Sequence, residues 1–246
     1  MTNSKNKRRP RPLPLGLKMI YEDADLLVVD KPGGLLSMAT DRERERTAYF
    51  FMTDYVRKGN ARSRNRIFIV HRLDRETSGV LLFAKTESAK IKLQDNWDST
   101  RKTYLAIVQG HPAQNQGSIT SYLTENAAHV VHSTMDESRG RFSQTDFRVI
   151  KRTPALTLLE LNLVTGRKNQ IRVHLSEKGL PIVGDKKYGP TKSGSPRLAL
   201  HARKIQFVHP VTGQEMVCEA EVPPFFQNLI GNCSEINPST ERPRRS

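Results

Sequence analysis

The sequence is poor in cysteine and has no long apolar run. Its two cysteines, Cys218 and Cys233, are too few for a disulfide framework, a Cys-based zinc finger or an iron–sulfur cluster. The longest uninterrupted apolar run, Val80 to Ala84, is far shorter than the roughly 20 residues that a membrane-spanning helix needs. No apolar stretch that could act as a signal peptide follows the basic N-terminus. These absences predict a cytoplasmic protein without membrane contact.

Acidic residues are also scarce in this chain. Forty Lys and Arg residues stand against 25 Asp and Glu residues among 246, which gives a net charge of +15. So large an excess on a folded chain predicts a polyanionic partner, and with a membrane excluded that partner is expected to be nucleic acid. Hydrophobic residues make up 36% of the chain. This is enough to bury a sizeable core without disulfides or metal ions.

Charge and proline content divide the chain into three predicted segments. Residues 1–17 contain five Lys or Arg, three prolines and no acid, so we expect a disordered basic arm. Residues 18–231 contain no repeat and no long linker, and they are predicted to form a single folded domain. Residues 232–246 are predicted to be a disordered C-terminal tail.

Hydrophobic patterns predict more strands than helices. The expected strands are Leu26–Asp30, Ile67–Val70, Val80–Ala84, Tyr104–Gln109, Phe142–Ile150 and Leu156–Val164, followed by a hairpin of Leu198–Phe207 and Glu215–Val222. The expected helices are Thr86–Trp97, capped by its threonine, and Arg167–Lys178. A phase change in Leu156–Val164 predicts a bulge or a strand buried on both faces. Strands and helices do not alternate regularly, so the expected fold class is α+β, with a mixed, mostly antiparallel β-sheet core and flanking helices.

The first candidate site is the polar loop HRLDRETSG, His71 to Gly79, which lies between two apolar strands. Asp74 is flanked in it by Arg72 and Arg75. Loops that are held by rigid elements often carry function. The local pattern alone fits equally well a structural turn in which the aspartate caps backbone amides.

The second candidate site is the basic segment TGRKNQIRVHLSEKGLPIVGDKKYG, Thr165 to Gly189. Arg172 follows the inward-facing Ile171 on the predicted helix, so we expect its side chain to point partly into the fold. A buried arginine needs a carboxylate partner, and Asp74 would serve. The remaining basic residues of the segment fit a solvated face equally well.

The segment HRLDRETSGVLLFAK closely resembles the active-site motif of the RluA-type pseudouridine synthases. Further segments resemble other motifs of that family in the same order: DADLLVVDKPGG at 23–34, RKTYLAIVQG at 101–110, the basic segment at 165–189 and LALHA at 198–202. Together they span about residues 18–226. The resemblance implies the pseudouridine synthase fold, with residues 18–231 as the catalytic domain of a member without an S4-like RNA-binding module.

The resemblance also implies which residues act on the target nucleotide. Asp74 would be the catalytic aspartate, Tyr104 the tyrosine that lies against the target base, and Arg172 the arginine that pairs with the aspartate. Ile171 and Leu200 would line the base pocket. An arginine close to Asp74 would favour the ionised carboxylate that a nucleophile or base requires.

The same resemblance suggests residues that contact RNA. Arg72 would enter the helix stack when the target uridine leaves it, with His71 beside it. Arg167 and Lys168 would contact phosphate, although Lys168-Asn169 stands where the family commonly has a small residue and a histidine.

A run of five cations without an acid extends from Arg57 to Arg66. We predict that it contacts RNA, with Arg62 and Arg64 as candidates, although a solvated loop explains the run equally well.

The expected activity is isomerisation of specific uridines in structured RNA, either a ribosomal RNA of the 23S type or a transfer RNA stem-loop. The reaction adds no group and transfers no net electrons, so the resemblance implies no metal and no small-molecule cofactor, and we expect a monomer.

One alternative is a non-catalytic RNA-binding or ribosome-associated protein. Another is a metal-dependent nuclease that uses His71, His174 and His201, which lie in separate motifs without ligand-like spacing.

Overall fold

One large β-sheet organises the part of the chain that the structure describes. The computed structural model describes residues 13–41, 43–60, 62–190 and 195–232. The strands are β1 (Lys18–Glu22), β2 (Leu26–Lys31), β3 (Phe68–Ile69), β4 (Ser78–Ala84), β5 (Arg101–Gln109), β6 (Gln116–Glu125), β7 (Val131–Thr134), β8 (Arg141–Arg152), β9 (Leu156–Leu163), β10 (Leu200–Val208) and β11 (Glu215–Glu219). The α-helices are α1 (Ala48–Arg57), α2 (Glu87–Asp95), α3 (Gln170–Glu177) and α4 (Pro224–Ile230). Short 3-10 helices occupy Pro14–Gly16 and Trp97–Ser99.

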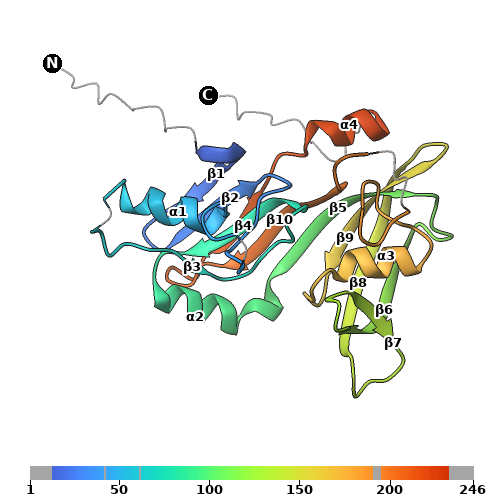
Figure 1. Cartoon of the computed structure of the whole chain (residues 1–246), viewed down its shortest axis with the longest axis horizontal. Helices are drawn as coiled ribbons and strands as arrows, with labels where there is room; N and C mark the ends of the chain where they lie inside the picture. Colours follow the sequence, from blue (N-terminus) through green and yellow to red (C-terminus); the bar gives the residue numbers. More distant parts are fainter. Residues whose placement is uncertain (1–12, 42, 61, 191–194, 233–246) are drawn as a thin grey trace.

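The strand order is β1-β2-β4-β10-β5-β9-β8-β6-β7, with β11 beside β10 and β3 beside β4. Within this sheet β10 runs parallel to β4, and the other strand pairs are antiparallel. The predicted α+β fold with a mixed, mostly antiparallel sheet is therefore confirmed. Figure 1 shows β10 and β5 crossing the middle of the molecule and joining its two halves.

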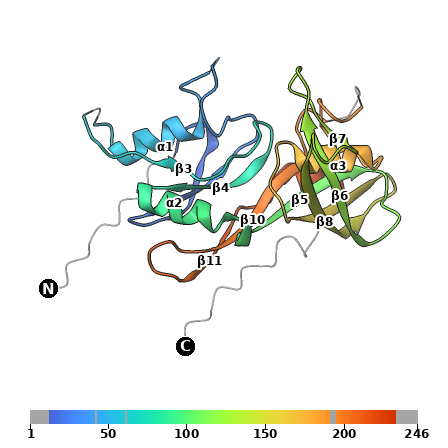
Figure 2. The same ribbon diagram turned by 90° about the horizontal axis from the view of Figure 1, so that it is seen from below.

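The first half of the sheet is covered on both faces. Alternate residues of β2 point to opposite sides: Leu27 and Val29 pack with Met52 of α1, whereas Leu26 and Val28 pack with Leu93 of α2. Figure 2 shows these two helices on opposite sides of β4. A strand buried on both faces has a continuous apolar run, which is why the sequence pattern identified β2 and β4 correctly.

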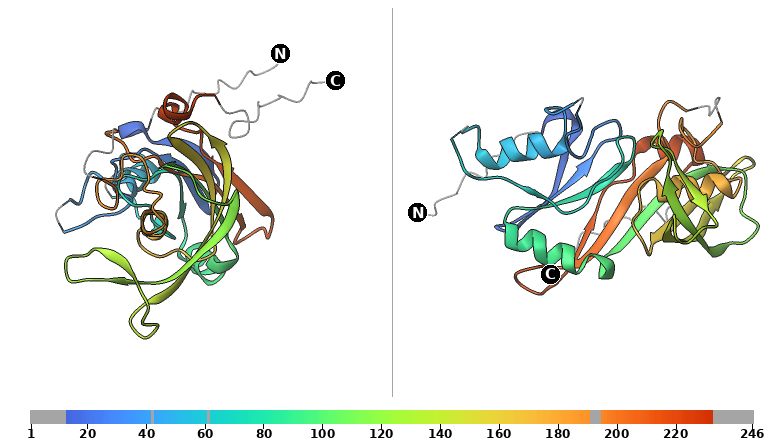
Figure 3. Two further views of the ribbon diagram at one scale, coloured as in Figure 1. Left: turned by 90° about the vertical axis from the view of Figure 1, so that its right-hand side faces the viewer. Right: turned by 60° about the horizontal axis from the view of Figure 1, so that its bottom comes forward.

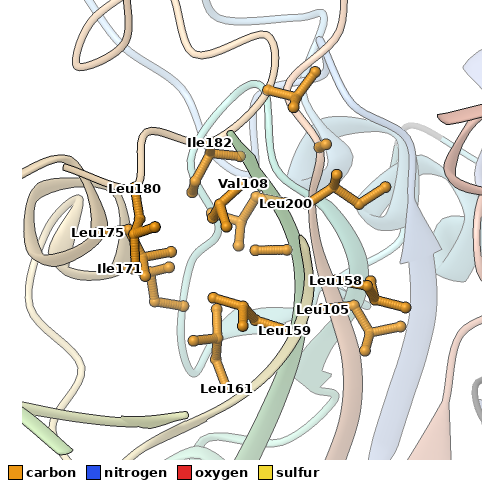
Figure 4. Packing of buried hydrophobic residues seen from close by; sticks show 14 of the residues in the cluster. Leu105, Val108, Leu158, Leu159, Leu161, Ile171, Leu175, Leu180, Ile182 and Leu200 are labelled. Atoms are coloured by element: carbon orange, nitrogen blue, oxygen red, sulfur yellow. The ribbon is translucent and has the colours of Figure 1, made fainter. Parts of the chain in front are cut away.

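The second half of the sheet wraps around α3. Ile171 and Leu175 of this helix point to the same side of the sheet as Leu159, whereas Leu158 lies on the opposite side (Figure 4). Leu158 and Leu159 are both fully buried, which confirms the predicted strand buried on both faces. The irregular register lies opposite them on β8, between Val149 and Lys151. The curvature of this half is visible in the left view of Figure 3.

Several elements differ from the sequence expectations. The helix expected at Arg167–Lys178 begins three residues later, at Gln170, while Thr86 caps α2 as expected by accepting a hydrogen bond from the Ala89 amide. The predicted arm of residues 1–17 extends too far, because Leu17 is buried in the core and packs beside α1. The rest of that prediction, residues 1–12, lies outside the described residues, as do 233–246 of the predicted tail. Among the described residues, no helix has the length and apolarity to cross a membrane.

Candidate active site

A pocket of about 250 Å³ lies where the two halves of the sheet meet. One wall is the HRLD loop that precedes β4, another is the start of α3, and Tyr104 of β5 lies between them. Most of the residues singled out in the sequence line this pocket: His71, Arg72, Asp74, Tyr104, Arg167, Ile171, Arg172 and Leu200. The fold therefore brings together four motifs, whose residues in the pocket extend from His71 to Leu200.

The HRLD loop is held through its backbone. The Ser37 hydroxyl donates to the Leu73 carbonyl at 2.8 Å and accepts from the Leu73 amide at 3.0 Å. The Gly34 amide donates to the Arg75 carbonyl at 2.8 Å. Because these anchors hold backbone atoms, the side chains of the loop remain available to the pocket.

A buried lysine reinforces the same loop from beneath. Lys31 is fully buried, and its ammonium donates to the carbonyls of Pro32, Leu35 and Arg75. Burial lowers the pKa of Lys31 to about 7, although nearby carboxylates, Asp74 among them, oppose this shift. The segment DKPGG, which includes this lysine, thus supports the loop that carries Asp74.

The end of the loop is fixed to β10. Gly79 has a φ of +113°, and a Cβ at this position would lie 2.2 Å from the Ala202 carbonyl oxygen. Only glycine fits such a close approach of two backbones. The Ser78 hydroxyl lies 2.9 Å from Nδ1 of His201, which is fully buried. Through these contacts the TSG and LALHA segments lie side by side in the fold.

Arg172 lies at the centre of the site and contacts two aspartates unequally. Its Nε and Nη2 donate to the two carboxylate oxygens of Asp185 at 2.8 and 2.7 Å. Its Nη1 lies 3.1 Å from Oδ1 of Asn169 and 3.5 Å from Oδ2 of Asp74. The ring of Tyr188 faces the guanidinium at 5.1 Å. The expected pair with Asp74 is present, but the bidentate partner is Asp185, which the sequence analysis did not single out.

The electrostatics of the buried pair favour its ionised form. Burial alone would lower the pKa of Arg172, but the hydrogen bonds and charge of Asp185 outweigh it and raise this pKa. Burial likewise opposes the charge of Asp185, whose pKa is nevertheless lowered by Arg172 and by the amides of Tyr188 and Lys187. The guanidinium is therefore a fixed cation beside Asp74.

Asp74 and Tyr104 face the pocket with different accessibility. The side chain of Asp74 is 32% exposed, so its carboxylate can be reached from the pocket. Tyr104 is half-buried on β5. Burial and the nearby charge of Asp74 raise the pKa of Tyr104, so its hydroxyl stays protonated near neutral pH.

His71 lines the pocket, but both sides of its ring are engaged by neighbouring groups. Its Nε2 accepts a hydrogen bond from the Leu82 amide at 3.0 Å, and its ring lies 4.8 Å from that of Trp97. Burial lowers the pKa of His71 to about 3, which keeps the ring neutral. Arg72, the next residue, is exposed at the rim. A contact of His71 with RNA stays a prediction, and its visible role is to position the loop.

The remaining predicted RNA contacts lie outside the central pocket or at its edge. Arg167 is exposed, and its Nε lies 3.4 Å from the Phe142 carbonyl. Lys168 pairs with Glu125 rather than lining the pocket. Arg62 and Arg64 are exposed in the segment that follows α1 and do not line it either.

The three histidines of the nuclease alternative do not gather around one point. His174 lies between the hydroxyls of Ser121 and Thr145, each 3.0 Å away, while His71 and His201 contact different neighbours. Among the described residues, one trio of side chains is close enough to share a metal ion: Asp23, Asp25 and His209, which do not line the central pocket. The geometry therefore gives no support to a metal-dependent nuclease at this site.

Comparison with known proteins agrees with this geometry. The family model described as RNA pseudouridylate synthase matches residues 25–177. The dual-specificity RNA pseudouridine synthase RluA of Haemophilus influenzae is 34% identical over 85% of this chain and 95% of its own length. The ribosomal large subunit pseudouridine synthase D of Zymomonas mobilis is 32% identical over 89% of this chain and 73% of its own. The solved human RNA pseudouridylate synthase domain containing 4 shares the fold with a TM-score of 0.72 at 23% identity, covering 85% of this chain and 89% of its own.

The fold, the pocket and these matches define an isomerase that acts on RNA. The chain belongs to the RNA pseudouridylate synthase family and is of the RluA type. Its reaction converts uridine in RNA into pseudouridine. The family expected from the sequence motifs is thereby confirmed, and the non-catalytic and nuclease alternatives are set aside.

Proposed function

We propose that this enzyme isomerises a uridine in large-subunit ribosomal RNA and that Asp74 is its catalytic carboxylate. The supporting observation is that Asp74 is the one carboxylate among the residues that line the central pocket. It is accessible there and lies 3.5 Å from a cation that other groups hold in place. The unit that performs the reaction would be residues 18–231.

The reaction in the pocket needs few chemical groups, but these groups must be held in a defined geometry. The glycosidic bond of the uridine breaks, the uracil turns over while it is retained, and C5 rejoins C1′. A carboxylate is needed as nucleophile or base, and water must be kept from the reactive intermediate. Because the fork of Arg172 is occupied by Asp185, a single Nη1 is left to stabilise Asp74, which keeps its other oxygen for the reaction.

The apolar side of the pocket would hold the detached base. Ile171 and Leu200 are buried beside Tyr104, whose ring can lie against a pyrimidine. Aromatic stacking on a base is worth about 1–3 kcal/mol. This contact would recover part of the few kcal/mol needed to extrude a stacked nucleotide.

The exposed cations would bind the RNA around the extruded nucleotide. Arg72 and Arg167 both line the pocket and are exposed; Arg72 would fill the space that the uridine leaves, and Arg167 would contact a neighbouring phosphate. Arg62 and Arg64 follow α1 in the chain and do not line the central pocket, so they would contact RNA further from the target. Such phosphate contacts should make binding strongly salt-dependent.

The substrate proposal draws on the named activity of the relatives. One is a ribosomal large subunit synthase and another a dual-specificity enzyme. We therefore place the target in large-subunit ribosomal RNA, with the enzyme acting in the cytoplasm as a monomer. A transfer RNA stem-loop is the alternative substrate.

Mapping of pseudouridines in total RNA from a deletion strain tests this proposal. We expect the loss of at least one pseudouridine in large-subunit ribosomal RNA, restored by the wild-type gene and not by an Asp74→Asn variant. Losses confined to transfer RNA would overturn the ribosomal assignment. Restoration by Asp74→Asn would overturn the role of the aspartate.

A further inference from the structure

A second pocket, of about 270 Å³, opens beside the active-site pocket. It lies between the β6–β7 hairpin, the start of β8 and the segment that leads into α3. Four cations line it: Arg139, Arg141, Arg167 and Lys168. Arg167 also lines the active-site pocket, so the two pockets are adjacent.

The cations of this second pocket are only weakly neutralised. Glu125 is the single carboxylate that lines it, and it pairs with Lys168. Arg139 makes an ion pair with Asp136 at 3.3 Å, but its side chain is 80% exposed. Arg141 makes no ion pair within the described parts of the chain. Four cations face two carboxylates, Glu125 in the lining and Asp136 beside Arg139, and this excess of positive charge favours a further anion.

The β6–β7 hairpin that forms one wall is fixed to α3 and to the segments on either side of this helix. The Tyr188 hydroxyl accepts hydrogen bonds from the Val131 amide and from Nδ2 of Asn169, both at 3.1 Å. The Ser133 amide donates to Glu177 of α3 at 3.0 Å. Tyr188 also faces Arg172. The second pocket therefore has a fixed position relative to the active site, because the hairpin that forms its wall is anchored.

We propose that this second pocket binds a phosphate of the RNA backbone next to the target nucleotide and that this phosphate displaces Glu125 from Lys168. The inference rests on the proposed function and extends it to a specific backbone contact. Because Arg167 borders both pockets, a nucleotide extruded into one would leave its backbone at the entrance of the other. Arginine side chains suit this task, since their planar fork can bind two phosphate oxygens.

Glu125 has a defined part in this exchange. Its carboxylate occupies the position beside Lys168 where a phosphate would sit, and it also contacts Nδ1 of His129 at 2.9 Å. Two anions cannot share that position without repulsion. The glutamate should therefore compete with RNA, and its removal should strengthen binding.

Arg141→Gln is the first test, with Arg148→Gln as its matched control. Both arginines lie on β8, and Arg148 pairs with Glu160 outside the second pocket. Arg141→Gln should weaken binding of an RNA fragment that contains the mapped uridine about tenfold and reduce the salt slope by about one, with kcat unchanged at saturating RNA. Equal weakening by both variants would show a diffuse charge effect and overturn the proposal. If Arg141→Gln does not fold, Arg139→Gln tests the same pocket from an exposed turn.

Glu125→Gln is the second test, and Glu160→Gln is its control. Glu160 pairs with Arg148, Glu125 pairs with Lys168 and also contacts His129, and both glutamate side chains are about one-third exposed. Glu125→Gln should tighten RNA binding about threefold beyond the gain from Glu160→Gln. Equal effects would overturn the competition between Glu125 and phosphate.

Ethylation interference then locates the contact. Blocking one phosphate beside the target uridine should inhibit binding by the wild-type protein and have no further effect on Arg141→Gln. No such phosphate, or the same interference in both proteins, would overturn the proposal. These binding assays do not depend on turnover, so a protein that binds the fragment without forming pseudouridine would contradict the proposed function and still test this pocket.

Discussion

The two aspartates on either side of Arg172 have opposite surroundings. Asp185 has a side chain that is 1% exposed and accepts four hydrogen bonds, two from Arg172 and one each from the amides of Lys187 and Tyr188. Asp74 has a side chain that is 32% exposed and a single contact with the arginine, at 3.5 Å. The same residue type meets the same guanidinium in both cases.

This difference separates positioning from reaction. Asp185 is buried and does not line the central pocket, so it cannot reach a substrate there and serves to fix the arginine. Asp74 gains a nearby positive charge without losing its free oxygen. The buried pair of Asp185 and Arg172 thus has a structural role, whereas the exposed loop provides the carboxylate of Asp74 that is free to react.

Asp74→Asn is expected to have the largest effect on activity. The change is nearly isosteric and the loop is held by backbone bonds, so the melting temperature should stay within about 2 °C of the wild type. Removal of the one ionised carboxylate in the pocket should reduce pseudouridine formation below detection. RNA affinity should be kept or slightly increased, because a negative charge leaves a basic surface.

A tritium-release or mass-spectrometric assay on RNA, together with a binding assay, measures both properties of Asp74→Asn. Substantial activity would falsify the catalytic assignment. Loss of folding would instead support a structural turn aspartate.

Asp185→Asn should destabilise the fold rather than act on chemistry alone. It leaves the buried Arg172 without its bidentate anion, and breaking a buried pair costs about 3–5 kcal/mol. Urea unfolding should show this loss, whereas Asp95→Asn on the exposed side of α2 should change stability by less than about 0.5 kcal/mol. If Asp185→Asn were as stable as Asp74→Asn, the proposed difference in structural role between the two aspartates would be wrong.

Arg172→Lys should produce an intermediate effect. Lysine keeps the charge but cannot satisfy both oxygens of Asp185 and also reach Asp74. We expect turnover to fall about 10- to 100-fold, corresponding to the loss of one to two charge-assisted hydrogen bonds, with RNA binding nearly unchanged. Arg148→Lys, which alters an exposed pair, is the control. An unchanged turnover number would mean that a point charge beside Asp74 is sufficient.

Mild acid should have the smallest effect on stability for each titrating group. It acts on both the Asp74 loop and α3, because each contains a histidine with a pKa lowered by burial. Burial lowers the pKa of His71, at the start of the Asp74 loop, to about 3, and that of His174, in the helix of Arg172, to about 4. Between pH 6.5 and about 4 the unfolded chain binds protons that the folded chain does not, so stability falls as the pH drops. Each histidine contributes at most about 1.4 kcal/mol per pH unit.

Urea unfolding from pH 8 to pH 4.5 measures the effect of acid. His174→Gln should make the decline shallower below pH 6.5 and run parallel to the wild type above pH 7. A parallel decline over the whole range would contradict the assignment of His174 as a neutral buried group.

The sequence predicted the parts of the site that short patterns can carry. The HRLD loop lies between two apolar strands, and the position of Arg172 beside Ile171 indicated that it points inward. The chemistry of a buried arginine made Asp74, 98 residues away, a possible partner of Arg172, and the family resemblance implied this pair. The loop and the inward arginine rest on hydrophobic periodicity, whereas the roles of the residues rest on the resemblance.

The parts that the sequence did not predict depend on tertiary context. Asp185 follows an apolar stretch like an ordinary turn residue, and no local pattern shows that it faces Arg172. The β6–β7 hairpin was not predicted because its strands have one partly exposed face, with only Ile119 and Leu123 buried in β6. Its basic pocket forms from three separate segments, so no run of cations marks it in the sequence.

The place of β10 in the sheet has a consequence for how the molecule assembles. β4 and β5 follow each other in the chain but do not pair, because β10, made of Leu200–Val208, lies between them. The two halves that form the active-site pocket therefore stay unjoined until a late segment of the chain has been synthesised and inserted. Such long-range pairing slows folding. The active-site pocket can thus be completed only after β10 has entered the sheet.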